Sequence, residues 1–271
     1  MVQVNNIREL DYEKINISGE WNEGDVNELT MHTIHSYPAK FPAFVASKAF
    51  KYAQKEGVQI HKVSDIFCGC GTVALEAKIR GYNFWGCDIN PVATLIAKTK
   101  SSSYDCAKVE QYFSNILESV RHLKMSPNLY QEAHERLKYW YSETNYCDLY
   151  KLYYAINTEV TEEKYREAFK CIFSSILKAC SKWLTKSIKP QVDPRKKEID
   201  VIQQFERQMK KFMKALTEIE LSNTQTTIKC TNFLNESELP STDLIITSPH
   251  PACPYNISQQ ISPSKLVCRY V

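Results

Sequence analysis

The stretch DIFCGCGT, at residues 65–72, decides how this chain of 271 residues folds. A short strand pattern at residues 62–67 runs into it, and a helical pattern follows it from Val73 to Arg80. A second short strand, at residues 83–87, then ends in Asp88. A strand, a glycine turn, a helix and a strand that ends in an acid are typical of a nucleotide-binding half-sheet. The glycines let the backbone pass close to a ligand, and the acid can accept both hydroxyls of a ribose.

The rest of the chain extends this unit into an α/β fold with a large helical insertion. Helical spacing is found at residues 43–56, a further helix begins at Pro91, and residues 105–221 carry almost continuous helical spacing. Strand patterns return at residues 226–230 and 243–247, so about four strands are visible. We expect three regions: an N-terminal loop with the ligand-binding half-sheet, a helical insertion, and a return to the sheet with an irregular tail. Their bounds are residues 1–104, 105–222 and 223–271.

The helical region is rich in aromatic residues and contains no glycine, since none follows Gly86. Its apolar positions recur at helical spacing, and such stripes normally pack inward. We therefore expect a helical core that includes the clustered aromatic residues of this region. They are Tyr139, Trp140, Tyr141, Tyr146, Tyr150, Tyr153 and Tyr154.

Composition and charge exclude several classes of protein. Hydrophobic residues make up 43% of the chain and charged residues 24%, which excludes an intrinsically disordered chain. No apolar run approaches the ~18 residues that span a bilayer, and residues 1–10 lack the apolar centre of a signal peptide. We therefore expect a soluble, cytoplasmic protein whose ten cysteines are reduced thiols. Their spacing does not form the paired ligands of a zinc site, so no metal is expected.

A second motif, TSPHP at residues 247–251, follows the last strand pattern. Ser-Pro at the end of a buried strand presents a side-chain oxygen and a carbonyl at the carboxyl edge of the sheet, where α/β proteins bind ligands. Alone it indicates only a turn, and its meaning comes from pairing with the glycine turn. We expect the loops that contain Gly69 and Ser248 to lie side by side along one edge of the sheet.

Together these motifs resemble those of the amino-methylating DNA methyltransferases, which use S-adenosylmethionine to methylate the exocyclic amine of cytosine or adenine. The resemblance covers residues 31–250, and the motifs stand in the order found in that family. HSYPAKFP (residues 35–42) resembles the N-terminal cofactor motif, DIFCGCGT (65–72) the glycine motif, and WGCDINP (85–91) the motif with the ribose-binding acid. SIKPQVDP (187–194) resembles a segment before the catalytic motif in one branch, and DLIITSP (243–249) resembles the catalytic strand.

The resemblance implies a Rossmann-like methyltransferase sheet with S-adenosylmethionine as its cofactor. The glycine turn would pass under the methionine end of the cofactor, Asp88 would hold its ribose, and Asn232 would face its adenine. The residues implied in cofactor binding are Tyr37, Lys40, Phe41, Asp65, Phe67, Gly69, Gly71, Asp88 and Asn232.

The resemblance also implies the catalytic residues, which are Ser248, Pro249 and His250. Ser248 and the carbonyl of Pro249 would accept hydrogen bonds from the target amine and aim its lone pair at the methyl group. The base would leave the duplex, and His250 either replaces the aromatic residue that normally stacks on it or is a solvated turn residue. A serine in the first position favours cytosine N4 over adenine N6. Methylation at cytosine C5 is excluded, because it needs a Pro-Cys dipeptide that the chain lacks.

A basic segment offers a surface for DNA. Residues 182–214 carry ten Lys or Arg against four Asp or Glu, a net +6, whereas the whole chain has +3. We expect phosphates to bind there with an affinity that falls with salt, although a solvated helix face has the same composition. The residues expected to bind nucleic acid are Lys182, Lys186, Lys189, Arg195, Lys196 and Lys197. The protein would then serve a restriction–modification or related defence system and associate with the nucleoid.

Two departures from the family leave alternatives open. The usual Ser-Pro-Pro-Tyr is Ser-Pro-His-Pro here, and the 24 residues after Thr247 are too few for three more strands of a seven-stranded sheet. We expect the N-terminal portion of a methyltransferase that is cut short within the catalytic motif by truncation or frameshift, or an enzyme whose sheet a second chain completes. The alternative functions are an RNA or tRNA amino-methyltransferase and an inactive remnant or subunit.

Overall fold

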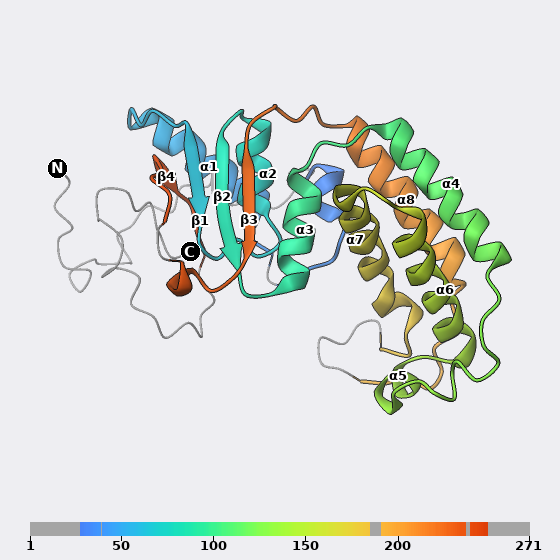
Figure 1. Ribbon diagram of the computed structural model, residues 1–271. Helices are drawn as coiled ribbons and strands as arrows, with labels where there is room; N and C mark the ends of the chain where they lie inside the picture. The colour runs from blue at the N-terminus through green and yellow to red at the C-terminus, as the bar shows by residue number, and fades with distance from the viewer. Residues whose placement is uncertain (1–27, 39, 185–190, 237–238, 249–271) are drawn as a thin grey trace.

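The computed structural model describes residues 28–38, 40–184, 191–236 and 239–248. In this part of the chain, four parallel strands form one sheet (Figure 1). The strands are β1 (Lys62–Asp65), β2 (Asn83–Asp88), β3 (Thr226–Cys230) and β4 (Leu244–Ile245). Their order in the sheet is β3-β2-β1-β4. The predicted α/β fold with a Rossmann-like sheet is confirmed.

β1 lies inside the sheet, with β2 on one side and β4 on the other. The chain therefore builds the sheet outward from β1 in one direction and then returns to its other side. In open α/β sheets, ligands bind at the carboxyl ends of the two strands where this reversal occurs. In this protein those strands are β1 and β4, which carry the glycine turn and Ser248.

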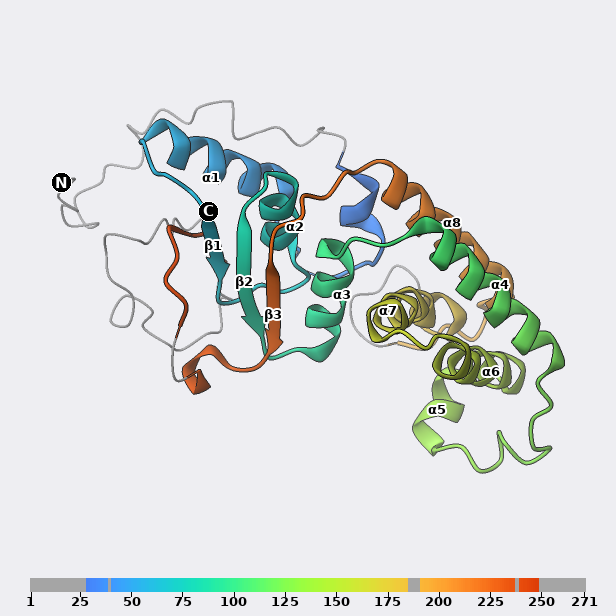
Figure 2. The same ribbon diagram turned by 45° about the horizontal axis from the view of Figure 1, so that its top comes forward.

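Three helices pack on one face of the sheet: α1 (Ala43–Lys55), α2 (Thr72–Ile79) and α3 (Pro91–Ser101). They share one apolar cluster with the strands. In Figure 2, α1 crosses above the upper ends of the strands and α2 lies next to it. The members that join all three helices to the sheet include Phe50 of α1, Ala74 of α2, Ala97 of α3, Val63 of β1 and Phe84 of β2.

A block of helices follows α3 along the chain and lies beside the sheet in Figure 1. Its helices are α4 (Cys106–His122), α5 (Glu135–Trp140), α6 (Glu143–Glu159), α7 (Glu163–Cys180) and α8 (Val201–Thr217). α4, α6, α7 and α8 surround a second, larger apolar cluster, which also contains Leu75 of α2 and Ile96 of α3. The block therefore packs against two of the helices that cover the sheet. No helix in the described part of the chain combines the length and the apolar composition that a membrane crossing needs.

Side-chain caps explain where several of these helices begin. Asn90 before α3, Asp105 before α4 and Asp200 before α8 each accept a hydrogen bond from a first-turn backbone N–H, at 3.0, 2.9 and 2.9 Å. α2 is different, because Gly71 is its N-cap and has no side chain to cap the first turn. The first N–H groups of α2 are therefore left for other acceptors.

The expectation that the clustered aromatic residues form the helical core is wrong for four of them. Tyr139, Tyr150, Tyr153 and Tyr154 are between 42% and 59% exposed. α6 buries the opposite face, which contains Leu149, Leu152, Ala155 and Ile156. The aliphatic stripe decides which face of the helix turns inward, and the tyrosines, whose hydroxyls favour water, take the other face.

Gly71 is required by two independent constraints. Its φ is +76°, a left-handed backbone conformation that residues other than glycine rarely adopt. A Cβ at this position would also lie 2.5 Å from Cβ of Ala97 on α3. The glycine turn and α3 therefore approach too closely for any side chain between them.

We predict that Gly71→Ala destabilises the protein more than Gly57→Ala does. Gly57 has almost the same φ, +77°, but a Cβ at that position would have no atom within 4 Å, so its substitution adds backbone strain alone. That strain costs about 1–2 kcal/mol, and the clash with Ala97 adds about 1–3 kcal/mol of overpacking. Urea unfolding of both variants measures the difference. Equal losses in the two variants would show that the contact between the turn and α3 is not tight.

Candidate functional site

The carboxyl ends of β1 and β4 lie next to each other. Ser64 pairs with Ile245 in parallel register, and the backbone N–H of Ile246 donates to the carbonyl of Ser64 at 3.1 Å. One residue further, the hydroxyl of Thr247 donates to Oδ1 of Asp65 at 2.7 Å. The expectation that the loops after the first and last strands leave the same edge of the sheet is therefore confirmed.

The glycine turn is held in shape by backbone hydrogen bonds. The N–H of Gly71 donates to the carbonyl of Cys68 at 2.8 Å, and the N–H of Cys68 donates to the carbonyl of Cys87 on β2 at 3.0 Å. Gly69 has a φ of +47°, and a Cβ there would make only ordinary contacts, at 3.9 Å with Tyr37 and 4.0 Å with the carbonyl of Phe67. A small side chain at Gly69 would therefore meet no clash, and the Tyr37 ring lies next to it.

Asp88, at the end of β2, connects that strand to the glycine turn. Its Oδ2 accepts the N–H of Gly69 at 2.9 Å, and its Oδ1 accepts the N–H of Asn90 at 2.8 Å. Each carboxylate oxygen has a second lone pair, so both oxygens can still accept a hydroxyl. Asp88 is partly exposed, in the position from which an acid can hold a ribose.

Of the predicted residues in the N-terminal loop, Tyr37 is the one that reaches the glycine turn. Its hydroxyl accepts a hydrogen bond from Nδ2 of Asn90 at 3.4 Å. Burial and then the nearby charge of Asp88 raise the pKa of Tyr37, which keeps the phenol neutral. Lys40 pairs instead with Glu28, and Phe41 packs against the apolar cluster of α1 and α2.

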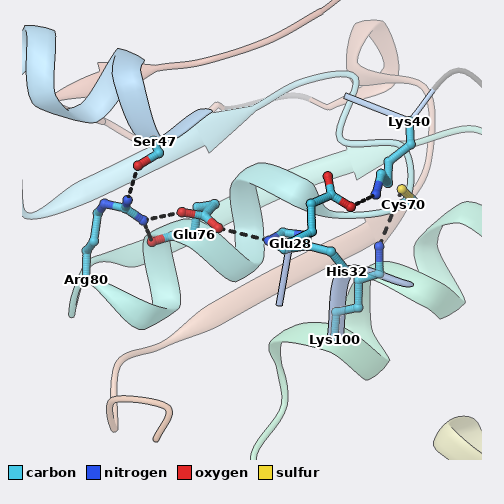
Figure 3. Close-up of polar contacts among 8 residues, drawn as sticks. All are labelled: Glu28, His32, Lys40, Ser47, Cys70, Glu76, Arg80 and Lys100. Carbon is cyan, nitrogen blue, oxygen red and sulfur yellow. Dashed lines mark hydrogen bonds and ion pairs between the residues drawn. The ribbon is translucent and has the colours of Figure 1, made fainter. Parts of the chain in front are cut away.

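A buried polar network fixes this loop to α2, as Figure 3 shows. Glu76, on α2, accepts a hydrogen bond from Nε2 of His32 at 2.9 Å and pairs with Arg80, whose other nitrogen donates to Ser47 at 2.7 Å. Burial favours a higher pKa for Glu76, but the hydrogen bonds from His32 and Arg80 outweigh it and leave the pKa below its ordinary value. Sequence reasoning missed this network, although a lone acid in the apolar helix TVALEAKI signals it.

The loop is also attached to the helical block. Nε2 of His35 lies 3.1 Å from the hydroxyl of Ser174 on α7, and burial lowers the pKa of His35. The ammonium of Lys211 on α8 donates to the carbonyl of Thr33, in the short helix η4 (Thr30–Thr33). The position of the loop beside the glycine turn therefore depends on both parts of the fold.

A second unpredicted contact lies under the turn. The ammonium nitrogen of Lys100, which is fully buried at the end of α3, lies 3.6 Å from Sγ of Cys70 (Figure 3). Burial lowers the pKa of Lys100. The carbon chain of Lys100 spans the space between α3 and the turn.

The remaining predicted cofactor residues lie along the same edge. Asp65 is 4% exposed, and Oδ1 of its carboxylate accepts the N–H of Phe67 at 3.1 Å in addition to the Thr247 hydroxyl. Burial raises the pKa of Asp65 to about 7. Asn232 follows β3 and caps the short helix η5 (Phe233–Asn235), whose Phe233 packs edge-on against Phe67 with ring centroids 5.3 Å apart. Ser248 is exposed, and Pro249 and His250 lie outside the described residues.

The basic segment continues from the carboxyl end of α7. α7 begins beside the end of α3, where Lys164 donates to the carbonyl of Ser103 at 2.8 Å. α3 runs antiparallel to the strands, so α7 runs back toward the carboxyl edge of the sheet.

The predicted basic residues differ in what their charges do. Arg195 and Lys197 are exposed and Lys182 is half-buried. The ammonium of Lys196 donates to the carbonyls of Lys178 and Trp183, both at 3.1 Å, and burial lowers its pKa. Lys196 therefore holds the segment in shape, which was not expected for a phosphate-binding residue. Lys186 and Lys189 lie outside the described residues.

Comparison with known proteins assigns this site to a family. Residues 48–235, from α1 to η5, match the family described as D12 class N6 adenine-specific DNA methyltransferase. The chain is 27% identical over 166 residues to a protein of Kocuria varians named Type II methyltransferase M.MvaI. That alignment covers 58% of this chain and 36% of the relative, so the matched part spans about a third of the relative's length.

We predict that Lys100→Met increases the free energy of unfolding at pH 7 by about 1–4 kcal/mol, because it removes a buried amine of lowered pKa. The unfolded chain keeps this amine protonated up to its ordinary pKa, so the gain shrinks as the pH rises from 7 toward that value. Lys98→Met, on the same helix, removes a partly exposed amine that pairs with Glu167 at 2.9 Å, and changes stability by less than about 1 kcal/mol. Urea unfolding of both variants at pH 7 and pH 10 tests this, and a destabilised Lys100→Met protein would contradict it.

Proposed function

Because the chain belongs to the D12 class of N6-adenine-specific DNA methyltransferases, we propose that it transfers a methyl group from S-adenosylmethionine to an exocyclic amine of a DNA base. The observation that carries the proposal is the meeting of two loops at one edge of the sheet. The hydrogen bond between Thr247 and Asp65 joins the strand that ends in Ser248 to the strand that opens into the glycine turn.

The residues at this edge fit S-adenosylmethionine. The backbone of Gly69, which no side chain covers, would lie against the methionine end of the cofactor, and Tyr37 would lie beside it. Asp88 would accept the ribose hydroxyls with the lone pairs that its backbone contacts leave available. Asp65, Phe67, Gly71 and Asn232 would complete the binding surface. When bound, the cofactor supplies an electrophilic methyl group on a positively charged sulfur.

The role of the chain in methyl transfer is mainly to position the target. Ser248 would accept a hydrogen bond from the amine, together with Pro249, and direct the nitrogen lone pair along the line of attack. The cofactor held by Asp88 and the glycine turn would supply the methyl group and leave as a neutral thioether, and the amine held by Ser248 would release a proton to solvent. His250 would either stack on the base or be a solvated turn residue, as the sequence predicts.

We propose adenine N6 as the target amine, because the family that the chain matches is specific for it. The comparisons give no support to the preference for cytosine N4 that Ser248 suggested. The matched range ends at residue 235, ten residues before the end of β4 at Ile245, so the serine lies outside the part that defines the family match.

Duplex DNA with a flipped base is the proposed partner. Arg195 and Lys197 are exposed on the segment between α7 and α8, and their charges suit phosphate binding. A role in restriction–modification follows from this proposal, as does association with the nucleoid. A second chain that completes the sheet stays a prediction.

Tritium-labelled S-adenosylmethionine tests the activity. We expect label in duplex DNA, with N6-methyladenine as the modified nucleoside after digestion and mass spectrometry. Ser248→Ala should lower kcat about 100-fold while cofactor binding is retained. Asp88→Ala should instead raise the KM for the cofactor about tenfold or more.

Each other outcome of this assay contradicts part of the proposal. N4-methylcytosine in the digest would contradict the target base. Label in tRNA alone would support the RNA-methylating alternative. No label in any substrate, with cofactor binding retained, would support an inactive remnant or subunit.

We also predict that Arg195→Ala and Lys197→Ala weaken DNA binding at low salt and reduce the slope of log affinity against log salt by about 0.9 for each lost phosphate contact. Lys55→Ala is the control, since Lys55 is exposed at the end of α1, next to the opposite edge of the sheet. Fluorescence anisotropy with a labelled duplex measures the slopes. Equal slopes in all three variants would remove the basic segment from the DNA interface.

A further inference from the structure

Beyond the end of their backbone pairing, the segments of β1 and β4 are still joined by a hydrogen bond between side chains. β4 contains two residues, Leu244–Ile245, and its backbone pairing with β1 ends where Ile246 donates to Ser64. The next residue is Thr247, which is 7% exposed, and its hydroxyl donates to the 4% exposed Asp65 at 2.7 Å. This hydrogen bond therefore continues the contact between the strands to the residue before Ser248.

A matching contact holds the other end of the same segment. Oδ2 of Asp243, just before β4, accepts the backbone N–H groups of His61 and Lys62 at 2.8 and 2.9 Å. A carboxylate thus joins the two strands at each end of a very short pairing. The backbone alone gives this pairing few hydrogen bonds, so the two carboxylates add to the apolar contacts of Leu244 and Ile246 that hold the segment in place.

The same oxygen of Asp65 also holds the glycine turn. Oδ1 accepts the N–H of Phe67, which is the first residue after Ile66 on the way to Gly69, at 3.1 Å. Asp65 therefore has one atom in contact with both loops of the candidate site. A shift of either loop changes the geometry of the hydrogen bond to the other.

We propose that Thr247 is a positioning residue for methyl transfer, and that its hydroxyl fixes the spacing between Ser248 and the glycine turn through Asp65. This inference rests on the proposed function, because the two loops would hold the target amine and the methyl donor. Methyl transfer by direct displacement requires the amine and the methyl donor to be aligned. Its rate therefore depends on the spacing between the two groups, even when both stay bound.

The electrostatic surroundings of Asp65 give the proposal a pH dependence. The titratable groups that surround Asp65 are Asp88 at the end of β2, whose charge adds to burial in raising the pKa of Asp65, and the thiols of Cys68 and Cys87, whose own pKa values burial and then the charge of Asp65 raise. Burial raises the pKa of Asp65 to about 7, whereas the hydrogen bond from Thr247 favours the carboxylate. Protonation of Asp65 weakens its oxygen as an acceptor, so methyl transfer should slow as the pH falls through about 7.

Two substitutions at one position separate this role from packing. Thr247→Val keeps the shape of the side chain and removes the hydroxyl, and we expect kcat to fall about tenfold with less than a twofold change in the KM for the cofactor. The acidic limb of its pH–rate profile should move to higher pH, because the carboxylate has lost a hydrogen bond that favours it. Thr247→Ser keeps the hydroxyl and should restore kcat to within about twofold of the unmodified protein.

Thr242→Val is the matched control. Thr242 is a buried threonine just before the amino end of β4, so this substitution should leave kcat unchanged. Unchanged kcat in Thr247→Val would overturn the proposal, and so would an equal loss in Thr247→Ser or an unmoved pH profile.

A second measurement keeps this inference separate from the proposed function. If the unmodified chain transfers no methyl group, the proposed function fails, and NMR of carbon-13-labelled Asp65 decides whether the contact between the loops exists. The pKa of Asp65 should be higher in Thr247→Val than in the unmodified chain, and the amide signal of Gly69 should shift. An unchanged pKa would overturn the inference whether or not the chain is active.

Discussion

The pairing of β1 with β4 is the contact on which the candidate site depends. The residues that pair, Ser64 and Ile245, are far apart in the sequence, and the whole helical block lies between them. Closing such a long segment of chain costs entropy that the two residues of β4 cannot offset by themselves. The apolar core of the block, which continues into α2 and α3, brings the chain back to the sheet. The block is therefore needed for β4 to pair with β1 and for the candidate site to form.

The N-terminal loop shows the same dependence from the other side. His32 is fixed to α2 by Glu76, His35 to α7 by Ser174, and Thr33 to α8 by Lys211. The backbone N–H of Thr30 also donates to Glu218, directly after α8, at 3.1 Å. One short loop is thus held by three helices from both parts of the fold. A change in how the helical block packs would therefore shift the position of Tyr37 beside the glycine turn.

Local signals in the sequence were sufficient for the sheet and for the place of the site. Glycine turns, caps and alternating apolar residues act over a few positions, and the strands at 62–65, 83–88 and 226–230 lie within a residue or two of their predicted bounds. The meeting of the two loops followed from a rule about parallel strands. The contacts of Glu76, Lys100 and Lys196 did not follow, because each joins segments distant in sequence. The exposed tyrosines were misplaced because periodicity identifies a stripe but does not say that every aromatic residue belongs to it.

The distribution of thiols has a consequence for following motion at the site. Cys68 and Cys70 lie in the glycine turn and are almost completely shielded from solvent, whereas Cys106 and Cys230 are exposed. An alkylating reagent reaches a shielded thiol only when the surrounding structure opens, so its reaction rate reports the free energy of that local opening. The alkylation rate of the two thiols in the turn therefore measures how often the turn opens. The rate at the exposed thiols gives the reference value for a thiol that needs no opening.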